Sequence, residues 1–197
     1  MSHSQLIETR DEDAALVLRV GEGDVGAYRE LVARYAPELL GFATRMLRDA
    51  TEAEDVVQET CLRLWQHARE YKPSARVTTW LHRITHNLAI DRLRARGRLK
   101  PLPDQDEDED AMPESARQPS LIDEKRRVLA LDAALAELPK RQAAALTLVH
   151  LHGLSGKEAA EVLGIGAEAL ESLLARARRA LKAGLTEPRA AGAKGAS

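Results

Sequence analysis

The sequence predicts an all-α protein of two small helical domains, an N-terminal helical bundle and a C-terminal helix-turn-helix bundle, joined by an acidic flexible linker. Apolar residues recur every three to four positions in both halves, and strand patterns are nearly absent. The stretch 101–119 has almost no large apolar side chain, so it cannot bury enough surface to offset the entropy of ordering it. We therefore expect domains over 12–98 and 123–184, a linker over 99–122 and a disordered tail over 185–197.

The N-terminal domain is expected to open with a short helix and a longer one. The short helix should cover 13–20 and end at Gly21, and Asp24 can cap the helix that follows. Pro37 is expected to bend or restart this second helix, because proline lacks the amide hydrogen that a helix interior needs.

The second half of this domain predicts two more helices. Thr51 and Glu54 have the spacing of a capping box, which predicts a helix over 55–65. A turn near 71–74 should separate it from a basic helix over 77–95.

The C-terminal domain is expected to begin with a helix over 123–138, followed by one that has Pro139 in its first turn and stops at Gly153. Ser155 with Glu158 forms a second possible capping box before a short helix. A tight glycine-bearing turn and a longer helix, to about residue 183, complete the pattern of a helix-turn-helix.

The charge is divided unevenly along the chain. The formal net charge is −2, but 76–100 has seven Lys or Arg against one acid, +6, while 101–119 has seven acids against one Arg, −6. The local field steers a charged partner more than the total does, so the basic stretch predicts a nucleic-acid surface. Asp55, Gln58 and Glu59 share one helix face, which predicts a second, protein partner.

A cytoplasmic location is expected. The single cysteine, Cys61, excludes an intramolecular disulfide and favours a reducing compartment. No apolar stretch is long enough to span a bilayer, and the acidic N-terminus has no apolar core, so neither secretion nor membrane contact is indicated.

Several motifs occur in an order that is far more specific than any one alone. They lie at 27–32, 53–59, 64–65 and 79–91 in the first domain, and at 138–142, 153–155, 158–160 and 176–178 in the second. Through these motifs the chain resembles a bacterial RNA polymerase sigma factor of the extracytoplasmic-function (ECF) type, in the sigma-70 family. The resemblance implies a non-catalytic subunit that directs promoter-specific initiation, together with an anti-sigma factor as a further partner.

The resemblance assigns the first domain to polymerase docking and to melting and reading of the minus-ten element. The residues matching the surface that docks on the clamp helices of the beta-prime subunit of RNA polymerase core are Asp55, Gln58, Glu59 and Arg63. Those expected to contact melted promoter DNA are Trp80, Arg83, His86, Asn87, Arg94 and Arg96. Opening a duplex requires unstacked bases to be held by aromatic rings and by charge along the backbone, which these residue types can supply.

The helix-turn-helix is expected to contact the minus-thirty-five element. Its candidate DNA-binding residues are Lys157, Glu168, Glu171, Ser172, Arg176 and Arg179. The sequence departs from the family pattern at Glu171, where Lys or Arg is common, and at Leu173, where Arg is common. Acids oppose the approach of phosphate, so we expect this domain to bind DNA weakly and to read only a few bases.

Other interpretations were weighed for individual residues. Trp65 is expected in the core, whereas Trp80 suits either the core or a base-stacking platform. His82 and His86 are one turn apart but have no third ligand, and His150 and His152 match no known cage, so no metal site and no cofactor are expected.

Two other functions were considered for the whole chain. An interaction adaptor that has lost upstream DNA reading is the main alternative, since Glu168 and Glu171 permit it. An enzyme is disfavoured because the sequence has no nucleophile–base pair, phosphate loop or metal cluster.

Overall fold

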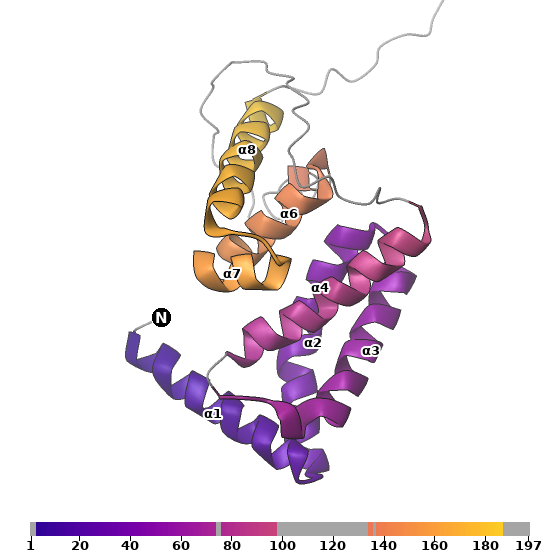
Figure 1. Ribbon diagram of the computed structural model, residues 1–197, viewed down its shortest axis with the longest axis vertical. Helices are drawn as coiled ribbons and strands as arrows, with labels where there is room; N and C mark the ends of the chain where they lie inside the picture. Colours follow the sequence, from indigo (N-terminus) through magenta and orange to yellow (C-terminus); the bar gives the residue numbers. More distant parts are fainter. Residues whose placement is uncertain (1–2, 74–75, 98–133, 136, 187–197) are drawn as a thin grey trace, which may run out of the picture.

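The N-terminal unit is a bundle of helices that pack through one apolar core (Figure 1). The computed structural model describes residues 3–73, 76–97, 134–135 and 137–186. Within them, the elements of the N-terminal unit are α1 (His3–Gly21), α2 (Val25–Leu47), α3 (Ala50–His67), the 3-10 turn η1 (Ala68–Glu70) and α4 (Val77–Ala95). The core is filled by the large side chains of α2, α3 and α4, with Phe42, Leu64 and Leu93 almost fully buried.

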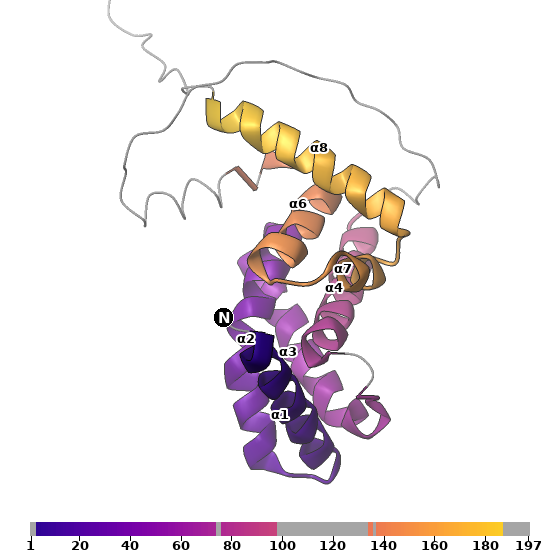
Figure 2. The ribbon, with the colours of Figure 1, turned by 90° about the vertical axis from the view of Figure 1, so that its left-hand side faces the viewer.

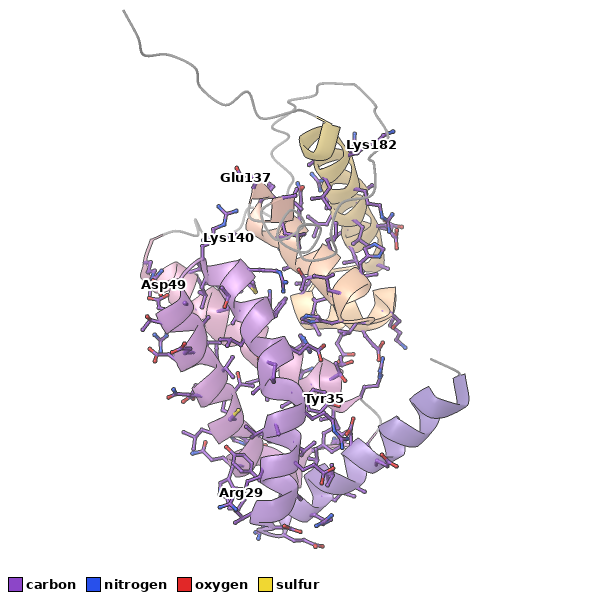
Figure 3. The ribbon with its side chains drawn as sticks, turned by 180° about the vertical axis from the view of Figure 1, so that it is seen from behind. Arg29, Tyr35, Asp49, Glu137, Lys140 and Lys182 are labelled. Atoms are coloured by element: carbon purple, nitrogen blue, oxygen red, sulfur yellow. The ribbon has the colours of Figure 1, made fainter. Side chains whose placement is uncertain are left out.

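Helix α2 is longer and more continuous than the sequence predicted. Asp24 is its N-cap, as expected, and its carboxylate accepts hydrogen bonds from the amides of Gly26 (2.8 Å) and Ala27 (3.0 Å). The helix runs through Pro37, so the expected restart is wrong. The tertiary packing of this long apolar helix outweighs the loss of one backbone hydrogen bond. Near Pro37, the hydroxyl of Tyr35 donates to the carboxylate of Asp13 and ties α2 to α1 (Figure 3).

Helix α3 begins earlier than expected. Its N-cap is Asp49, which accepts from the amide of Glu52 at 3.1 Å, so the capping box predicted from Thr51 and Glu54 is wrong. Arg48, at φ 55°, ends α2 in the left-handed region, and Arg48 and Asp49 are the two residues between the helices. This two-residue connection places the first good acceptor at Asp49, and α3 begins at the next residue.

The C-terminal unit contains the helix-turn-helix. Its described elements are α6 (Lys140–Leu146), the π-helical turn η2 (Thr147–Leu151), α7 (Gly156–Leu163) and α8 (Ala167–Thr186). The capping box of Ser155 and Glu158 is confirmed, and Gly164 ends α7 at φ 66°, a conformation that favours glycine. The linker, the tail beyond 186 and most of the helix expected over 123–138 lie outside the described residues.

The two units pack directly against each other. Helix α7 lies on α4 and α6 lies on α2, as two perpendicular views show (Figures 1 and 2). The buried apolar cluster that includes Phe42 and Leu81 continues into Leu148 and Leu154 of the C-terminal unit. Arg48 also donates to the carbonyl of Leu138 at 2.9 Å. The sequence predicted two units but not this shared core.

Candidate functional site

The outward face of α3 carries the residues predicted to dock on a protein. Asp55 and Gln58 are exposed, while Glu59 and Arg63 are partly exposed and form an ion pair of 2.9 Å. The opposite face of α3 is buried in the bundle, which fixes the direction in which these side chains point. The helix therefore exposes a mainly acidic strip formed by these four residues.

Apolar side chains extend this strip toward the end of α3. Leu62 is 47% exposed and Trp65 is 38% exposed. The expectation that Trp65 lies in the core is wrong, because the helix turns it outward, where its ring meets Tyr28 edge to face at 5.4 Å between centroids. Exposed aromatic and aliphatic groups beside charged ones are typical of protein interfaces.

A shallow pocket of about 340 Å³ lies where α4 begins. It is lined in part by Tyr71, Thr79, Trp80 and Arg83, and by Glu161 of the C-terminal unit. The rings of Tyr71 and Trp80 are 5.2 Å apart between centroids and tilted by 46°. Trp80 is only partly buried, so both uses predicted for it, core packing and base stacking, are compatible with its position.

The cations on α4 and at its two ends lie next to carboxylates, most of which come from other elements. Arg92 is 3.5 Å from Asp55, and Arg96 is 3.2 Å from Asp49 and also pairs with Glu52. The other pairs are Arg76–Glu158 at 3.6 Å, Arg83–Glu161 at 3.3 Å and Arg94–Asp91 at 3.6 Å. The pairs of Arg83, Arg92 and Arg94 are about half exposed or more, and exposed pairs are each worth about 0–1 kcal/mol, whereas Arg76 and Arg96 are more deeply buried with their partners. Arg98 and Lys100 lie outside the described residues.

Two further predicted residues lie on α4 with different exposure. Asn87 is exposed, and its side chain also hydrogen-bonds with His86. His86 is partly buried, and burial, together with the positive charges of Arg141 and Arg94, lowers its pKa to about 4. His86 is therefore neutral at pH 7 and acts as a neutral hydrogen-bonding group rather than as a cation.

Helix α8 turns its predicted residues to solvent. Glu168, Glu171, Ser172 and Arg179 are exposed, Arg176 is partly buried, and Lys157 is exposed on α7. The opposite side of α8 is buried through Leu170, Leu174 and Ala177. The exposed face is thus acidic in its first half and basic in its second, with Arg178, Arg179 and Lys182 toward its end.

One side-chain cluster was missed in the sequence. Glu38 of α2, His82 of α4 and His152, which follows η2, bring one ligand atom each to within 4.8 Å of one another. His82 Nε2 lies 2.7 Å from His152 Nδ1, so the partner of His82 is on the other unit and not one turn away at His86. Residues this far apart in sequence meet only through the packing of the two units, and no spacing rule could have found them.

Comparison with known proteins assigns both units. Residues 31–99 match the family description Sigma-70 region 2, and residues 129–181 match Sigma-70, region 4. The chain is 35% identical over 185 residues to ECF RNA polymerase sigma factor SigE of Mycolicibacterium smegmatis, which covers 91% of this chain and 70% of that protein. This chain belongs to the ECF sigma factors. It is also 32% identical over 180 residues to the RNA polymerase sigma-H factor of Pseudomonas aeruginosa, covering 88% and 93% of the two chains.

Solved structures agree with this assignment. The ECF sigma factor matches CnrH in complex with the cytosolic domain of CnrY at a TM-score of 0.63 and 26% identity, over 88% of this chain and 96% of that one. It matches the sigma factor RpoE of Bartonella quintana, in complex with the anti-sigma factor NepR, at a TM-score of 0.62 and 26% identity, over 84% and 100%.

Membership of this family defines the general function of the chain. The chain is a transcription initiation factor that binds RNA polymerase and directs it to promoters, rather than an enzyme. In the part of the chain that the structure describes, no helix is long and apolar enough to cross a membrane.

Proposed function

We propose that this ECF sigma factor holds the clamp helices of core RNA polymerase with α3 and holds the opened minus-ten strand with α4. The observation that carries the proposal is the pairing of Arg92 with Asp55, which puts the cationic helix directly beside the docking strip. A strand melted next to docked polymerase would then meet α4 without a further movement of the N-terminal unit.

The chemistry of α4 suits an unpaired strand. Trp80 and Tyr71 offer aromatic surface for stacking, and Arg83 lies at the mouth of the same pocket. Asn87, one turn further along, can accept from and donate to a base edge. The cations farther along the helix suit the backbone, since phosphate can exchange with the carboxylates that now face them.

We infer a weaker role for α8 at the minus-thirty-five element. Its exposed Glu168 and Glu171 can accept from cytosine amines, while Arg176 and Arg179 are the groups left to contact phosphate. A second candidate function, an adaptor that no longer reads upstream DNA, is favoured by the same two acids. Transcription on templates with and without the upstream element separates the two functions.

Binding of both promoter elements requires the units to separate. Elements centred about 25 base pairs apart are about 85 Å apart along a duplex, whereas a folded chain of this length has a radius of gyration of about 16 Å. The contact of α7 with α4 must therefore open on the promoter.

We also propose that an anti-sigma factor binds this chain, because the similar RpoE was solved with one.

The docking assignment is tested with Asp55→Arg combined with Gln58→Ala. Both side chains are exposed, so the fold should persist while binding to core polymerase falls by at least 100-fold and run-off transcription is lost. Glu22→Arg, at the exposed turn between α1 and α2, is the matched charge-reversal control and should bind normally. Unchanged association of the double variant in a pull-down would remove α3 from the interface.

A further inference from the structure

The cluster of Glu38, His82 and His152 lies where the two units meet. Glu38 Oε1 is 3.7 Å from His82 Nε2 and 3.5 Å from His152 Nδ1, and the two ring nitrogens are 2.7 Å apart. The side chains of His82, His152 and Glu38 are 0%, 7% and 30% exposed. Three potential ligands thus converge on one point that is closed on the protein side and reachable from solvent past Glu38.

The hydrogen bonds of His82 fix which of its nitrogens can bind a metal. Its Nδ1 lies 2.8 Å from the carbonyl oxygen of Thr78. Because a carbonyl only accepts, Nδ1 carries the proton, and the lone pair of the neutral ring is on Nε2, which points at His152 and Glu38. Histidines that bind metals usually donate their other N–H to a carbonyl or carboxylate in this way. His82 is therefore already held in the tautomer and orientation of a ligand.

The distances are close to those of a tetrahedral site. With metal–ligand bonds of about 2.0–2.1 Å, neighbouring ligand atoms in a tetrahedron are about 3.3 Å apart. The two distances from Glu38, 3.5 and 3.7 Å, are near that value. The two ring nitrogens, 2.7 Å apart, need to separate by about 0.6 Å. Binding of the ion replaces the hydrogen bond in which His152 Nδ1–H donates to His82 Nε2, so the proton on His152 moves from Nδ1 to Nε2 or is released to solvent.

The backbone that delivers His152 is unusual. His152 follows the π-helical turn η2, and its amide donates to the carbonyl of Thr147 at 3.0 Å, five residues earlier. Gly153 then turns at φ 64°, in the left-handed region. Single π turns inside helices are rare and often occur at functional sites. Here the turn ends the helix so that the His152 ring faces α2 and α4.

We propose that Glu38, His82 and His152 bind one divalent transition-metal ion of the Zn²⁺ class, with a water molecule as fourth ligand on the open side. Two imidazoles and one carboxylate are donors that suit Zn²⁺ and do not suit Mg²⁺ or Ca²⁺, which prefer oxygen. Glu38 and His82 belong to the N-terminal unit and His152 to the C-terminal one, so the ion fastens the two units in the packed arrangement. The positive charges of Arg45 and Arg76, which act on His152 and Glu38, moderate the affinity.

The test is calorimetric titration of the full, untagged chain with ZnCl₂. We expect one ion to bind to the wild type, and His152→Gln and Glu38→Gln each to weaken that binding at least tenfold. His150→Gln is the matched control, because His150 lies in η2, contacts Arg178 at 3.3 Å and is outside the cluster, so it should bind as the wild type does. His82 is not a suitable position, because it is fully buried and its replacement would disturb the fold.

Two results would overturn the proposal. One is a wild-type chain with its native helical circular dichroism that binds no Zn²⁺. The other is His152→Gln binding Zn²⁺ as tightly as the wild type, which would locate the ion elsewhere. Neither measurement contains polymerase or DNA, so the outcome does not depend on the roles proposed for α3, α4 and α8.

Discussion

Helices α4 and α8 are both proposed to contact DNA, but their charged side chains lie in different surroundings. The segment 76–97, which contains α4, is basic in sequence, but in the structure each of its described cations lies beside a carboxylate. Helix α8 has exposed acids at its start and cations toward its end. The charge counted along a helix is therefore not the charge that a ligand meets. Around α4 most of the compensating carboxylates come from other helices, whereas the exposed acids of α8 belong to that helix itself.

This difference affects how each helix could bind DNA. For α4, phosphate has to replace a carboxylate that already occupies the position next to each arginine, which favours a partner brought close by docking. For α8, the acids Glu168 and Glu171 at the start of the exposed face repel phosphate. Each helix alone should thus bind DNA weakly, for a different physical reason.

The largest effect is expected from Glu168→Arg combined with Glu171→Arg. The change removes two negative charges from the exposed face of α8 and adds two positive ones, a net change of +4, so affinity for duplex DNA should rise about 100-fold at low salt, with a steeper salt dependence. Fluorescence anisotropy over a salt series measures both quantities. Glu22→Arg with Glu54→Arg makes the same total change elsewhere and should have much less effect. Equal gains in the two double variants would mean that α8 has no special place in DNA binding.

A smaller effect is expected on the buried side of α4. Burial lowers the pKa of His86 to about 4 from an ordinary value near 6.5, so the unfolded chain binds a proton more readily than the folded one. The contribution of His86 to stability is complete above about pH 6.5 and is lost as the pH falls toward 4. Between pH 7 and 5 this group alone should cost about 2 kcal/mol of unfolding free energy.

Urea unfolding at pH 7 and pH 5 tests this expectation. The loss of stability between the two pH values should be about 2 kcal/mol smaller in His86→Gln than in the wild type. The same loss in both proteins would show that His86 does not titrate in this window.

The smallest effect is expected from Asp91→Asn. Asp91 lies 3.6 Å from Arg94 on the exposed side of α4, and both side chains are more than half exposed. Freeing Arg94 should raise affinity for single-stranded DNA only about two- to threefold, since exposed pairs are weak. A filter-binding titration with single-stranded DNA measures this affinity. A change of tenfold or more would indicate that the pair is a strong internal competitor rather than an exchangeable contact.

Local signals in the sequence were sufficient for some elements. The bounds of α4, the Asp24 cap and the capping box of Ser155 and Glu158 follow from residue type and spacing within a few positions, and the structure confirms them. The family motifs were local in the same sense, and they identified the family. These features depend on side chains acting on their own backbone, which a sequence displays directly.

Other features depended on contacts between distant segments and were not predictable. Helix α2 runs through Pro37, and Asp49 caps α3, because packing and a two-residue connection decide those points. The outward position of Trp65 depends on how α3 meets the bundle. The site residues themselves stay predictions. The structure adds what spacing could not show, which is that the charged side chains of α4 and α8 have different charged neighbours.

The two arginines at the start of α4 are held by acids of the other unit, Arg76 by Glu158 and Arg83 by Glu161. When a nucleic acid binds there, its phosphates replace these carboxylates beside the arginines. Few small ions are therefore released to solution. Because the slope of log affinity against log salt reports only ions released to solution, it would undercount the phosphates that α4 touches. A shallow slope for this protein should therefore not be taken as a sign of few backbone contacts.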